Sequence, residues 1–435
     1  MHIARSFTFS CLALVVLAAL GGQAFASTVA VGTCTGLINF ATIQLAVTSV
    51  PAGSTIEICP GTYPEQVVIS KKLTLEGITI GTAQDAAVIV PPAGGVVQNA
   101  TDVCLYPNPN YCSTGFPIAA QVLVENTAGP VKISNLTVDG LGNGLVNSCA
   151  LNLDGILFQN ASGTLNHVAV RNQIPGDVLS GCQTGDPIYV ESSTGTSAVT
   201  VENSSVHNYN KNGITGRYAG TTLTVTGSYV QGSGLNPVGL DAQNGIEVAF
   251  GAAGKISGNT VIDNLYGDPT TNTASDVLLY DAAESSGTAV TSNILGNSQI
   301  PIGLYTDTVG TYGDGVTVIG NKIFGTGAWD AIDVCTNSNT VTGNTIFNSA
   351  ESGVHLDASC TGTGTHNIAT GNTILESACA GILDDTSGTG SNSYNTETYY
   401  TVPFPITYST TACTIPEFGG AVAHAKTTRK FSPAP

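Results

Sequence analysis

The chain has few positive charges. Only 12 of its 435 residues are Lys or Arg, against 30 Asp or Glu, and the formal net charge is −18. Nucleic acids and anionic lipids are bound chiefly through Lys and Arg that neutralise phosphate groups. We therefore expect no nucleic-acid partner. A polyanionic sugar is also disfavoured unless a local basic patch or bound cations offset the acidity.

Long apolar runs are also scarce. The stretch CLALVVLAAL near the start is too short for an ordinary transmembrane helix. A weakly basic start with His2 and Arg5 precedes it, and the small residues of Ala24–Ala26 follow. This order is typical of a secretory signal peptide. We predict a signal peptide at 1–26 and a secreted or extracytoplasmic protein, in the periplasm or at the cell surface, without a transmembrane segment. A short uncleaved anchor is the alternative.

Long unbranched side chains are few, and Gly, Thr, Ser, Asn and Val dominate. The chain has one Met and one Trp but 52 Gly. Few helix formers and many β-branched residues are typical of an all-β protein with many tight turns. At this length, a single ordinary sandwich is excluded in favour of several domains or one elongated array.

The cysteines lack metal-binding spacings, because there is no C-x-x-C pair. Ten cysteines remain after the signal peptide, and an even number in an exported chain predicts disulfides. The sequence does not fix their connectivity. Our working hypothesis pairs nearest neighbours: Cys34–Cys59, Cys104–Cys112, Cys149–Cys182, Cys335–Cys360 and Cys379–Cys413.

A phrase repeats along the chain. VIGNKIFGTGAWDAIDVC begins at Val318, and VTGNTIFNSAESGVHLDASC begins 23 residues later at Val341. Short strands at this period predict a parallel solenoid with about 4.8 Å between stacked coils, and nine or ten coils would make a rod on the order of 50 Å long. The recurring position is Asn135, Asn166, Asn203, Asn259, Asn293, Asn321, Asn344 and Asn372, with Ser228 as a ninth copy.

We interpret these asparagines as structural. Asn tolerates the left-handed backbone of sharp corners, and stacked side-chain amides can hydrogen-bond to one another. Alternate strand residues such as Ile332 and Val334 should point into a shared apolar core. The residues between them, such as Asp333 and His355, should point to water.

The two ends predict closing elements. ATIQLAVTSV has apolar residues at helical spacing, at Ile43, Ala46, Val47 and Val50, and should form a helix across the open core. We predict an N-terminal cap at 27–62, a β-helix at 63–415 and a disordered tail at 416–435.

The run IQLAVTSVPAGSTIEICPGTYPEQVVISKKLTLEG resembles the opening of secreted proteins of the pectin-lyase-like superfamily, and the G-N-x-I coils resemble its generic repeat region. The resemblance covers nearly the whole mature chain. It implies an all-β, single-stranded right-handed parallel β-helix with an N-terminal capping helix. It also implies either a polysaccharide-modifying enzyme or an adhesin-like surface protein.

The sequence does not contain the active-site motifs of the superfamily's enzymes. ILDDTSGTG contains Asp384 and Asp385 but none of the other blocks of polygalacturonases. The blocks of pectin methylesterases and uronan epimerases are absent as well. No catalytic residue can therefore be carried over, and the fold alone does not assign a function.

The second strands of successive coils predict a candidate site. Residues on neighbouring coils lie about 5 Å apart. Asp333, His355, Asp357 and Asp385 should therefore meet and act as catalytic acids and bases. A solvated polar face is the alternative. The aligned outward rows are Glu247, Gly303, Asp333, His355 and Leu383, and then Ala249, Tyr305, Cys335, Asp357 and Asp385.

Aromatic residues beside this face predict substrate contacts. We expect Trp329, Tyr305 and Tyr280 to stack on sugar rings, with Glu247 as a further substrate-binding residue. Packing of the loops is the alternative. Acidic-sugar chemistry would need a nearby cation, and Lys322 is the one neighbour of this region in the sequence. Calcium among Asp330, Asp333, Asp357 and Asp385 is therefore the candidate cofactor, and a neutral substrate is the alternative. A basic patch of His207, Lys211 and Arg217 is interpreted as ordinary surface.

We therefore expect a secreted carbohydrate-interacting β-helix protein that modifies a polysaccharide as a lyase, hydrolase or epimerase. The alternative is a non-catalytic adhesive rod. The expected partner is a polysaccharide or a cell-surface glycan, and the expected state is a monomer.

Overall fold

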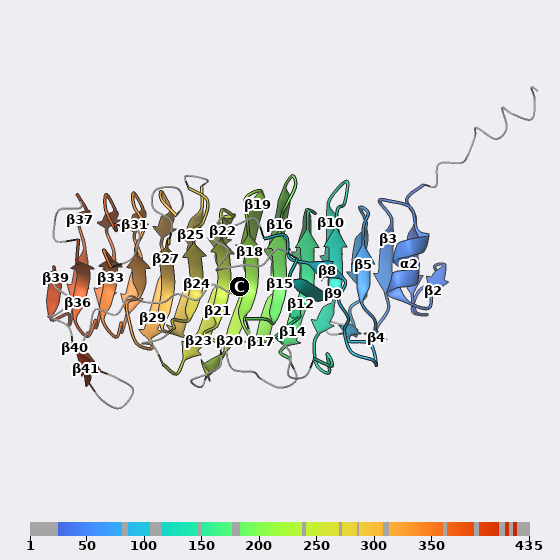
Figure 1. Ribbon diagram of the computed structural model, residues 1–435, viewed down its shortest axis with the longest axis horizontal. Coiled ribbons are helices and arrows are strands. Elements are labelled where there is room, and N and C mark those ends of the chain that lie inside the picture. Colours follow the sequence, from blue (N-terminus) through green and yellow to red (C-terminus); the bar gives the residue numbers. More distant parts are fainter. Residues whose placement is uncertain are drawn as a thin grey trace, which may run out of the picture.

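The computed structural model describes most of the chain between residues 25 and 423. The described ranges are 25–80, 86–104, 115–145, 149–175, 183–236, 241–268, 272–284, 287–307, 313–359, 363–386, 391–408, 414–416 and 421–423. The expected signal peptide lies almost wholly outside them. Within these ranges the fold is a right-handed parallel β-helix, an elongated rod of stacked coils (Figure 1).

Three long parallel sheets form the walls of the rod. Sheet A has 14 strands. Their order is β2 (Asn39–Phe40), β1 (Thr28–Val31), β3 (Thr55–Ile58), β6 (Thr74–Gly77), β10 (Val131–Ser134), β13 (Gly163–Asn166), β16 (Ser197–Glu202), β19 (Thr221–Thr226), β22 (Ala253–Ser257), β25 (Ala289–Thr291), β28 (Thr317–Ile319), β31 (Thr340–Thr342), β34 (Ile368–Thr370) and β37 (Ser393–Asn395).

Sheet B has 12 strands. Each coil adds one strand to each of the three walls. Their order is β38 (Thr398–Tyr400), β35 (Thr373–Leu375), β32 (Thr345–Phe347), β29 (Lys322–Thr326), β26 (Ile294–Ser298), β23 (Thr260–Tyr266), β20 (Tyr229–Asn236), β17 (Ser205–Tyr209), β14 (Ala169–Gln173), β11 (Thr137–Asp139), β7 (Ala87–Val90) and β4 (Gly61–Pro64).

Sheet C has 13 strands. Its main order is β39 (Phe404–Thr407), β36 (Ala380–Asp384), β33 (Ser352–Leu356), β30 (Ile332–Val334), β27 (Ile300–Tyr305), β24 (Ser275–Tyr280), β21 (Asn244–Ala249), β18 (Asn212–Arg217), β15 (Asp186–Glu191), β12 (Asn152–Gln159), β9 (Pro117–Glu125) and β5 (Val67–Ile69). β8 (Ala100–Thr101) pairs antiparallel with β9. A separate hairpin joins β40 (Thr414–Pro416) and β41 (Ala421–Ala423).

The repeated phrase is one coil, as predicted. Val318 pairs with Val341 in parallel register, and Ile332 and Val354 pair in sheet C. Their side chains are buried in one apolar core between the three sheets. The rod contains more coils than the nine or ten expected, because the early coils lack the Gly-Asn phrase that identified the later ones.

A ladder of asparagines lines one corner of the core. The Nδ2 group of Asn321 donates to Asn344 Oδ1 at 3.0 Å and to the Val290 carbonyl at 2.9 Å. The Oδ1 atom of Asn321 accepts from the backbone N–H of Asn293 at 3.0 Å. Equivalent bonds link Asn259, Asn293, Asn344 and Asn372, and Ser228 donates its backbone N–H to Asn259. The predicted structural role is confirmed for these positions.

The ladder alignment was wrong for the earliest copies. Asn135 and Asn203 have φ values of 56° and 50°, so they occupy the left-handed corner one residue before the ladder. Ser204 takes the ladder position in its coil, where its hydroxyl accepts from the Val168 N–H at 3.1 Å. The corner itself needs a left-handed residue, and Asn fills it as well as Gly does.

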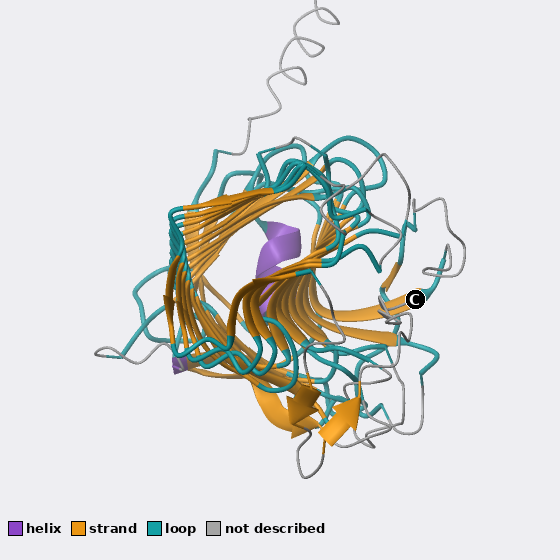
Figure 2. Ribbon diagram, turned by 90° about the vertical axis from the view of Figure 1, so that its left-hand side faces the viewer, coloured by secondary structure: helices purple, strands orange, loops and turns teal. Residues whose placement is uncertain are grey.

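One helix, α2 (Ile43–Ser49), lies within the outline of the three sheets (Figure 2). Thr42 caps it by accepting from the Leu45 N–H, and the Glu65 carboxylate accepts from the first two helical N–H groups at 2.8 Å. Its buried residues, Ile43, Ala46 and Val47, belong to the main core. None of the helices among the described residues has the length and apolarity that crossing a bilayer requires.

The expected disulfide between Cys34 and Cys59 is present, with 5.6 Å between the Cα atoms. Cys104, Cys149, Cys335 and Cys379 are also disulfide-bonded. The partners proposed for these four cysteines, Cys112, Cys182, Cys360 and Cys413, lie outside the described residues.

Candidate functional site

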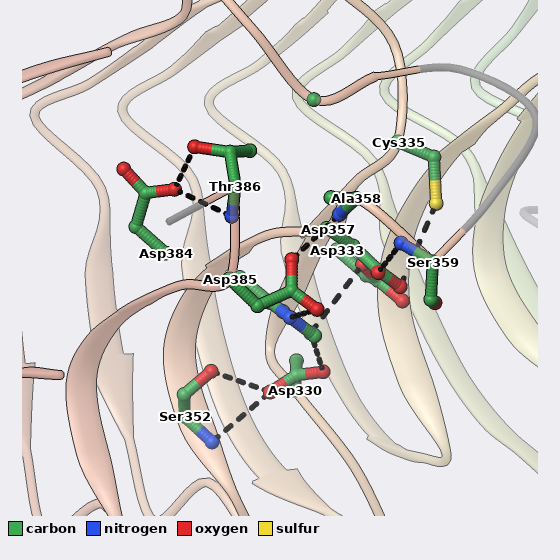
Figure 3. Close-up of polar contacts among 12 residues, drawn as sticks. Asp330, Asp333, Cys335, Ser352, Asp357, Ala358, Ser359, Asp384, Asp385 and Thr386 are labelled. Atoms are coloured by element: carbon green, nitrogen blue, oxygen red, sulfur yellow. Dashed lines mark hydrogen bonds and ion pairs between the residues drawn. The ribbon is translucent and has the colours of Figure 1, made fainter. Parts of the chain in front are cut away.

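The outer face of sheet C gathers carboxylates towards its C-terminal end. Asp333 of β30 pairs with Gly303 of β27 on one side and with His355 of β33 on the other. Asp357 and Asp385 directly follow β33 and β36. Asp330 comes from the loop before β30. Figure 3 shows Asp330, Asp333, Asp357 and Asp385 converging on one place. We call these four residues and His355 the His355 cluster.

His355 is at the centre of this cluster. Its Nδ1 atom lies 3.0 Å from Asp330 Oδ2 and 3.8 Å from Asp333 Oδ1, and its Nε2 atom lies 3.8 Å from Asp385 Oδ2. Ser352 holds Asp330 in turn, because both its backbone N–H and its hydroxyl donate to Asp330 Oδ1. The imidazole is therefore fixed by one carboxylate and faces two others.

Tyr305 fixes the second carboxylate. Its hydroxyl donates to Asp333 Oδ2 at 2.9 Å. The tyrosine ring lies over Gly303, where an added Cβ would meet the ring at 2.2 Å. A glycine is therefore required at this position for Tyr305 to reach across one coil to Asp333.

Backbone N–H groups hold the other two carboxylates. Asp385 Oδ1 accepts from Ala358 at 2.6 Å, and Asp357 Oδ1 accepts from Ser359 at 2.6 Å. One ring nitrogen of His355 and one carboxylate oxygen each of Asp357 and Asp385 lie within 4.8 Å of one another. The predicted group of four thus comes together, and Asp330 joins it.

The expectation of a solvated face was wrong. Asp330, Asp333 and Asp357 are fully buried, and the His355 side chain is 2% exposed. Asp385 is the most exposed member, with 17% of its side chain accessible. The reason is a second apolar layer outside sheet C. It contains Tyr218, Phe250, Leu278, Tyr280, Tyr305 and Cys335, with Trp329 packed against it.

The carboxylates set the charge of His355. Burial by itself lowers the pKa of an imidazole, because desolvation disfavours the charged form. The carboxylate charges of Asp330 and Asp357, together with the hydrogen bond to Asp330, outweigh burial and raise the pKa of His355 well above 6.5. These charges favour the imidazolium form, in which Nδ1–H donates to Asp330.

The cluster also has the chemistry of a cation site. Calcium prefers carboxylate oxygens, and two sets, Asp330–Asp333–His355 and His355–Asp357–Asp385, each place one atom per residue within 4.8 Å of the others. Cys335 Sγ lies 3.7 Å from Asp357 Oδ2, but a disulfide sulfur is not a thiolate ligand. The protonated His355 already supplies a positive charge at this place, so a metal ion would have to displace its proton.

The predicted substrate-binding residues are not arranged as expected. Strand β24 inserts Leu278 between Glu247 and Gly303, so Glu247 lies three coils from Asp333. Tyr280 and Tyr305 are 3% and 1% exposed and pack in the apolar layer. Neither offers an exposed ring to a sugar. Trp329 is half-buried beside them.

The basic patch was also interpreted wrongly. Lys211 and Arg217 are buried rather than ordinary surface, and His207 lies in sheet B instead of sheet C. The Nε and Nη2 atoms of Arg217 lie 2.8 and 2.7 Å from Glu247 Oε1. Arg217 also lies over the rings of Tyr189 and Phe250, 5.6 and 5.4 Å from their centroids.

Sequence reasoning missed the acids around Arg217. Asp154 pairs with Asp186, and Glu191 pairs with Arg217, in successive strands of sheet C. Burial, followed by the Asp102 charge, raises the pKa of Glu191 to about 8. Burial also raises the pKa of Asp186 to about 6. The segment DPIYVE contains both Asp186 and Glu191 and was the available sequence signal. It was missed because its coil has no Gly-Asn phrase to align it with the later coils.

Comparisons with known proteins agree on the fold. No known family profile matches the chain, and a search of curated proteins gave no match. A GH136 lacto-N-biosidase from Eubacterium ramulus has a TM-score of 0.51 at 12% identity, over 87% of this chain and 68% of that one. The Agl-KA catalytic domain has a TM-score of 0.51 at 14% identity, over 84% and 64%. A GH87 α-1,3-glucanase catalytic domain in complex with tetrasaccharides has a TM-score of 0.50 at 14% identity, over 88% and 68%.

This chain therefore spans about two thirds of the length of each of these three proteins. At such identities the similarity shows the architecture alone. The chain is an all-β protein with the parallel β-helix fold of these structures.

Proposed function

We propose that the protein is a carbohydrate-modifying enzyme that cleaves glycosidic bonds at the His355 cluster. The observation that carries the proposal is the buried ring of His355, whose Nδ1 atom lies 3.0 Å from Asp330 and whose Nε2 atom faces Asp385 at 3.8 Å. Perturbed, buried titratable groups of this kind concentrate at functional sites. The three structurally similar proteins are, by their names, a lacto-N-biosidase, a catalytic domain and a glucanase bound to tetrasaccharides, which is consistent with a sugar substrate.

The roles follow from exposure. Asp385 is the most accessible member and is the group that would contact the substrate. His355 lies behind it and can exchange a proton with it through Nε2, while Asp330 keeps the imidazole in one orientation. Asp357 is the second carboxylate, and its nearest oxygen lies within 4.8 Å of one on Asp385. Retaining glycosidases hold their two carboxyl groups about 5–5.5 Å apart, whereas inverting enzymes need about 6.5–9.5 Å. The short separation of Asp357 and Asp385 is closer to that of a retaining enzyme.

Hydrolysis of a neutral sugar fits better than elimination or epimerisation of an acidic sugar. Those two reactions require a cation to neutralise the carboxylate next to the reacting carbon. His355 is the one basic side chain of the cluster, and the carboxylates of Asp330 and Asp385 already face its two nitrogens, so its charge is not free to neutralise an acidic sugar. A neutral glycan is therefore the proposed substrate class.

The test is a screen of the mature protein against neutral and acidic polysaccharides, recording new reducing ends and unsaturated products. We expect reducing ends from a neutral glycan, and a loss of at least a hundredfold in rate for Asp385→Asn and for His355→Gln. Glu76→Gln is the matched control, because Glu76 is exposed on sheet A. Full activity in both cluster variants, with the fold verified by circular dichroism, would reject the site. Binding without turnover would favour the adhesive rod.

Calcium is a second candidate, because the carboxylates of Asp330, Asp333, Asp357 and Asp385 converge around His355. If calcium binds, it should raise the melting temperature more at pH 8.5 than at pH 6, because His355 must lose its proton first. Equilibrium dialysis without calcium uptake at both pH values would exclude it.

A further inference from the structure

A second group of polar residues lies under a segment that crosses sheet C. This strap, residues 99–104, comes from the connection between β7 and β9 and contains β8 (Figure 1). β8 pairs with the start of β9, and the backbone N–H groups of Asn99 and Asp102 donate to the carbonyls of Ile118 and Phe116. The strap then extends over neighbouring coils, where the Thr101 carbonyl accepts from Gln159 Nε2 at 2.8 Å.

The tip of the strap places a carboxylate in a prepared position. Asp102 is 6% exposed. Its Oδ1 atom accepts from the Tyr218 hydroxyl at 2.9 Å, and its Oδ2 atom accepts from the Tyr189 hydroxyl at 3.3 Å. Both tyrosines belong to coils later in the stack than the strap. The hydroxyl groups of Tyr189 and Tyr218 thus donate to the same carboxylate, and that carboxylate belongs to the strap rather than to sheet C.

Arg217 provides the charge behind these donors. Its guanidinium lies over the rings of Tyr189 and Phe250 and is 2% exposed. It attracts Asp102 electrostatically and is held in place by Glu247. An arginine fixed by aromatic rings, with two tyrosine hydroxyls in front of it, is a favourable receptor for a carboxylate.

The polar groups here are costly for a structural core. Glu247 Oε2 and Asp154 Oδ2 are buried without a hydrogen-bond partner among the described residues. Buried ion pairs can often be replaced by apolar side chains without loss of stability. A core that only had to be stable would not need these groups, and unsatisfied buried polar atoms of this kind mark sites that serve another purpose.

We propose that the strap is an autoinhibitory cover, and that the Asp102 carboxylate occupies the position of a carboxylate borne by a larger organic ligand. When the strap lifts, the hydroxyls of Tyr189 and Tyr218 and the charge of Arg217 bind that ligand. Glu191 lies beside the strap, with its Oε2 atom 3.5 Å from the Val103 nitrogen, and becomes available to a ligand hydroxyl. The site shares no residue with the His355 cluster, since β24 and β27 separate the two, so each can fail without the other.

The experiment uses the full mature chain and three probes: sodium D-glucuronate, neutral D-glucose and sodium acetate, all at constant ionic strength. Titration calorimetry should give at least tenfold tighter glucuronate binding to Asp102→Ala than to the wild type, with no binding of glucose. Adding Tyr218→Phe to Asp102→Ala should weaken glucuronate binding about fivefold to tenfold, the effect of one lost hydrogen bond. Lys132→Ala, on an exposed residue of β10 in sheet A, should bind like the wild type.

Hydrogen exchange supplies a readout that does not depend on a variant that folds. Glucuronate added to the wild type should speed exchange of the backbone amide of Asp102, because the ligand displaces the strap. Three results would each overturn the proposal. The first is equal binding of glucose and glucuronate, and the second is binding of acetate but not of glucuronate to Asp102→Ala. The third is unchanged hydrogen exchange of the strap in the wild type at saturating glucuronate. Acetate alone would mean that Asp102 is only a structural carboxylate.

Discussion

The asparagine at the corner of each late coil satisfies several backbone groups at once. Asn321 accepts one backbone N–H and one side-chain N–H from Asn293, and it donates to the Val290 carbonyl and to Asn344. All of these atoms are buried, where an unsatisfied polar group costs about 1–3 kcal/mol. One side chain therefore supports three coils.

Replacing Asn321 should be costly. We expect Asn321→Ala to destabilise the protein by about 3 kcal/mol or more, because it leaves the Val290 carbonyl and the Asn293 N–H unpaired. Thermal unfolding followed by circular dichroism measures this as a lower melting temperature.

Asn203→Gly is the control for this measurement. Asn203 sits at a left-handed corner rather than in the ladder, and glycine adopts its φ of 50° easily. Equal melting temperatures for the two variants would show that the ladder contributes nothing beyond the corner.

At the scale of the element, the strands were predictable but their outer faces were not. The alternation in Ile332, Asp333 and Val334 identified which residues face the core, and the register of β30 with β33 followed from the repeat. What covers the outer face comes from segments outside the repeat, such as the strap and the loop with Trp329. Because those segments have no period, the sequence predicted water where the structure has an apolar layer.

The acids under this layer predict a pH dependence. Glu191 has an ordinary pKa of 4.5, and its folded pKa is about 8. A carboxyl group whose pKa is raised by folding contributes stability that is complete below its unfolded pKa and is lost as the pH rises through the folded value. The folded protein should therefore lose stability between about pH 4.5 and pH 8, and the raised pKa values of Asp186 and His355 act in the same direction.

Glu191→Gln isolates this contribution, because glutamine imitates the protonated carboxyl group. We expect the variant to melt near the wild-type temperature at pH 5 and several degrees above it at pH 8.5. Glu202→Gln, on sheet A, should leave the pH profile unchanged. A wild-type melting temperature that rises from pH 5 to pH 8.5 would contradict the account.

At the scale of the whole molecule, coil stacking makes neighbours of residues that are far apart in the chain. Asp333 and Asp385 are 52 positions apart in the sequence, yet both face His355. The repeat predicted this meeting correctly, since Asp333 and His355 fall at equivalent positions of successive coils, and so do Asp357 and Asp385.

The sequence did not predict how far the alignment extends. Leu278 separates Glu247 from the cluster because β24, the second strand of the coil that holds Asn259, reads SDVLLY and does not resemble the second strands that the alignment includes. Asp330 was expected only as a calcium ligand, although it is the carboxylate that orients His355. Its position depends on a loop whose path the repeat does not encode.

The most direct test of the central claim is the titration of His355. One-bond carbon–proton spectra of ¹³C-histidine-labelled protein, with His355→Gln for assignment, follow its ring across the pH range. Because buried carboxylates surround the ring, we predict that His355 stays protonated well above pH 6.5, whereas the exposed His366 is the internal comparison. A His355 ring that loses its proton at or below pH 6.5 would contradict the stacked cluster on which the proposed activity depends.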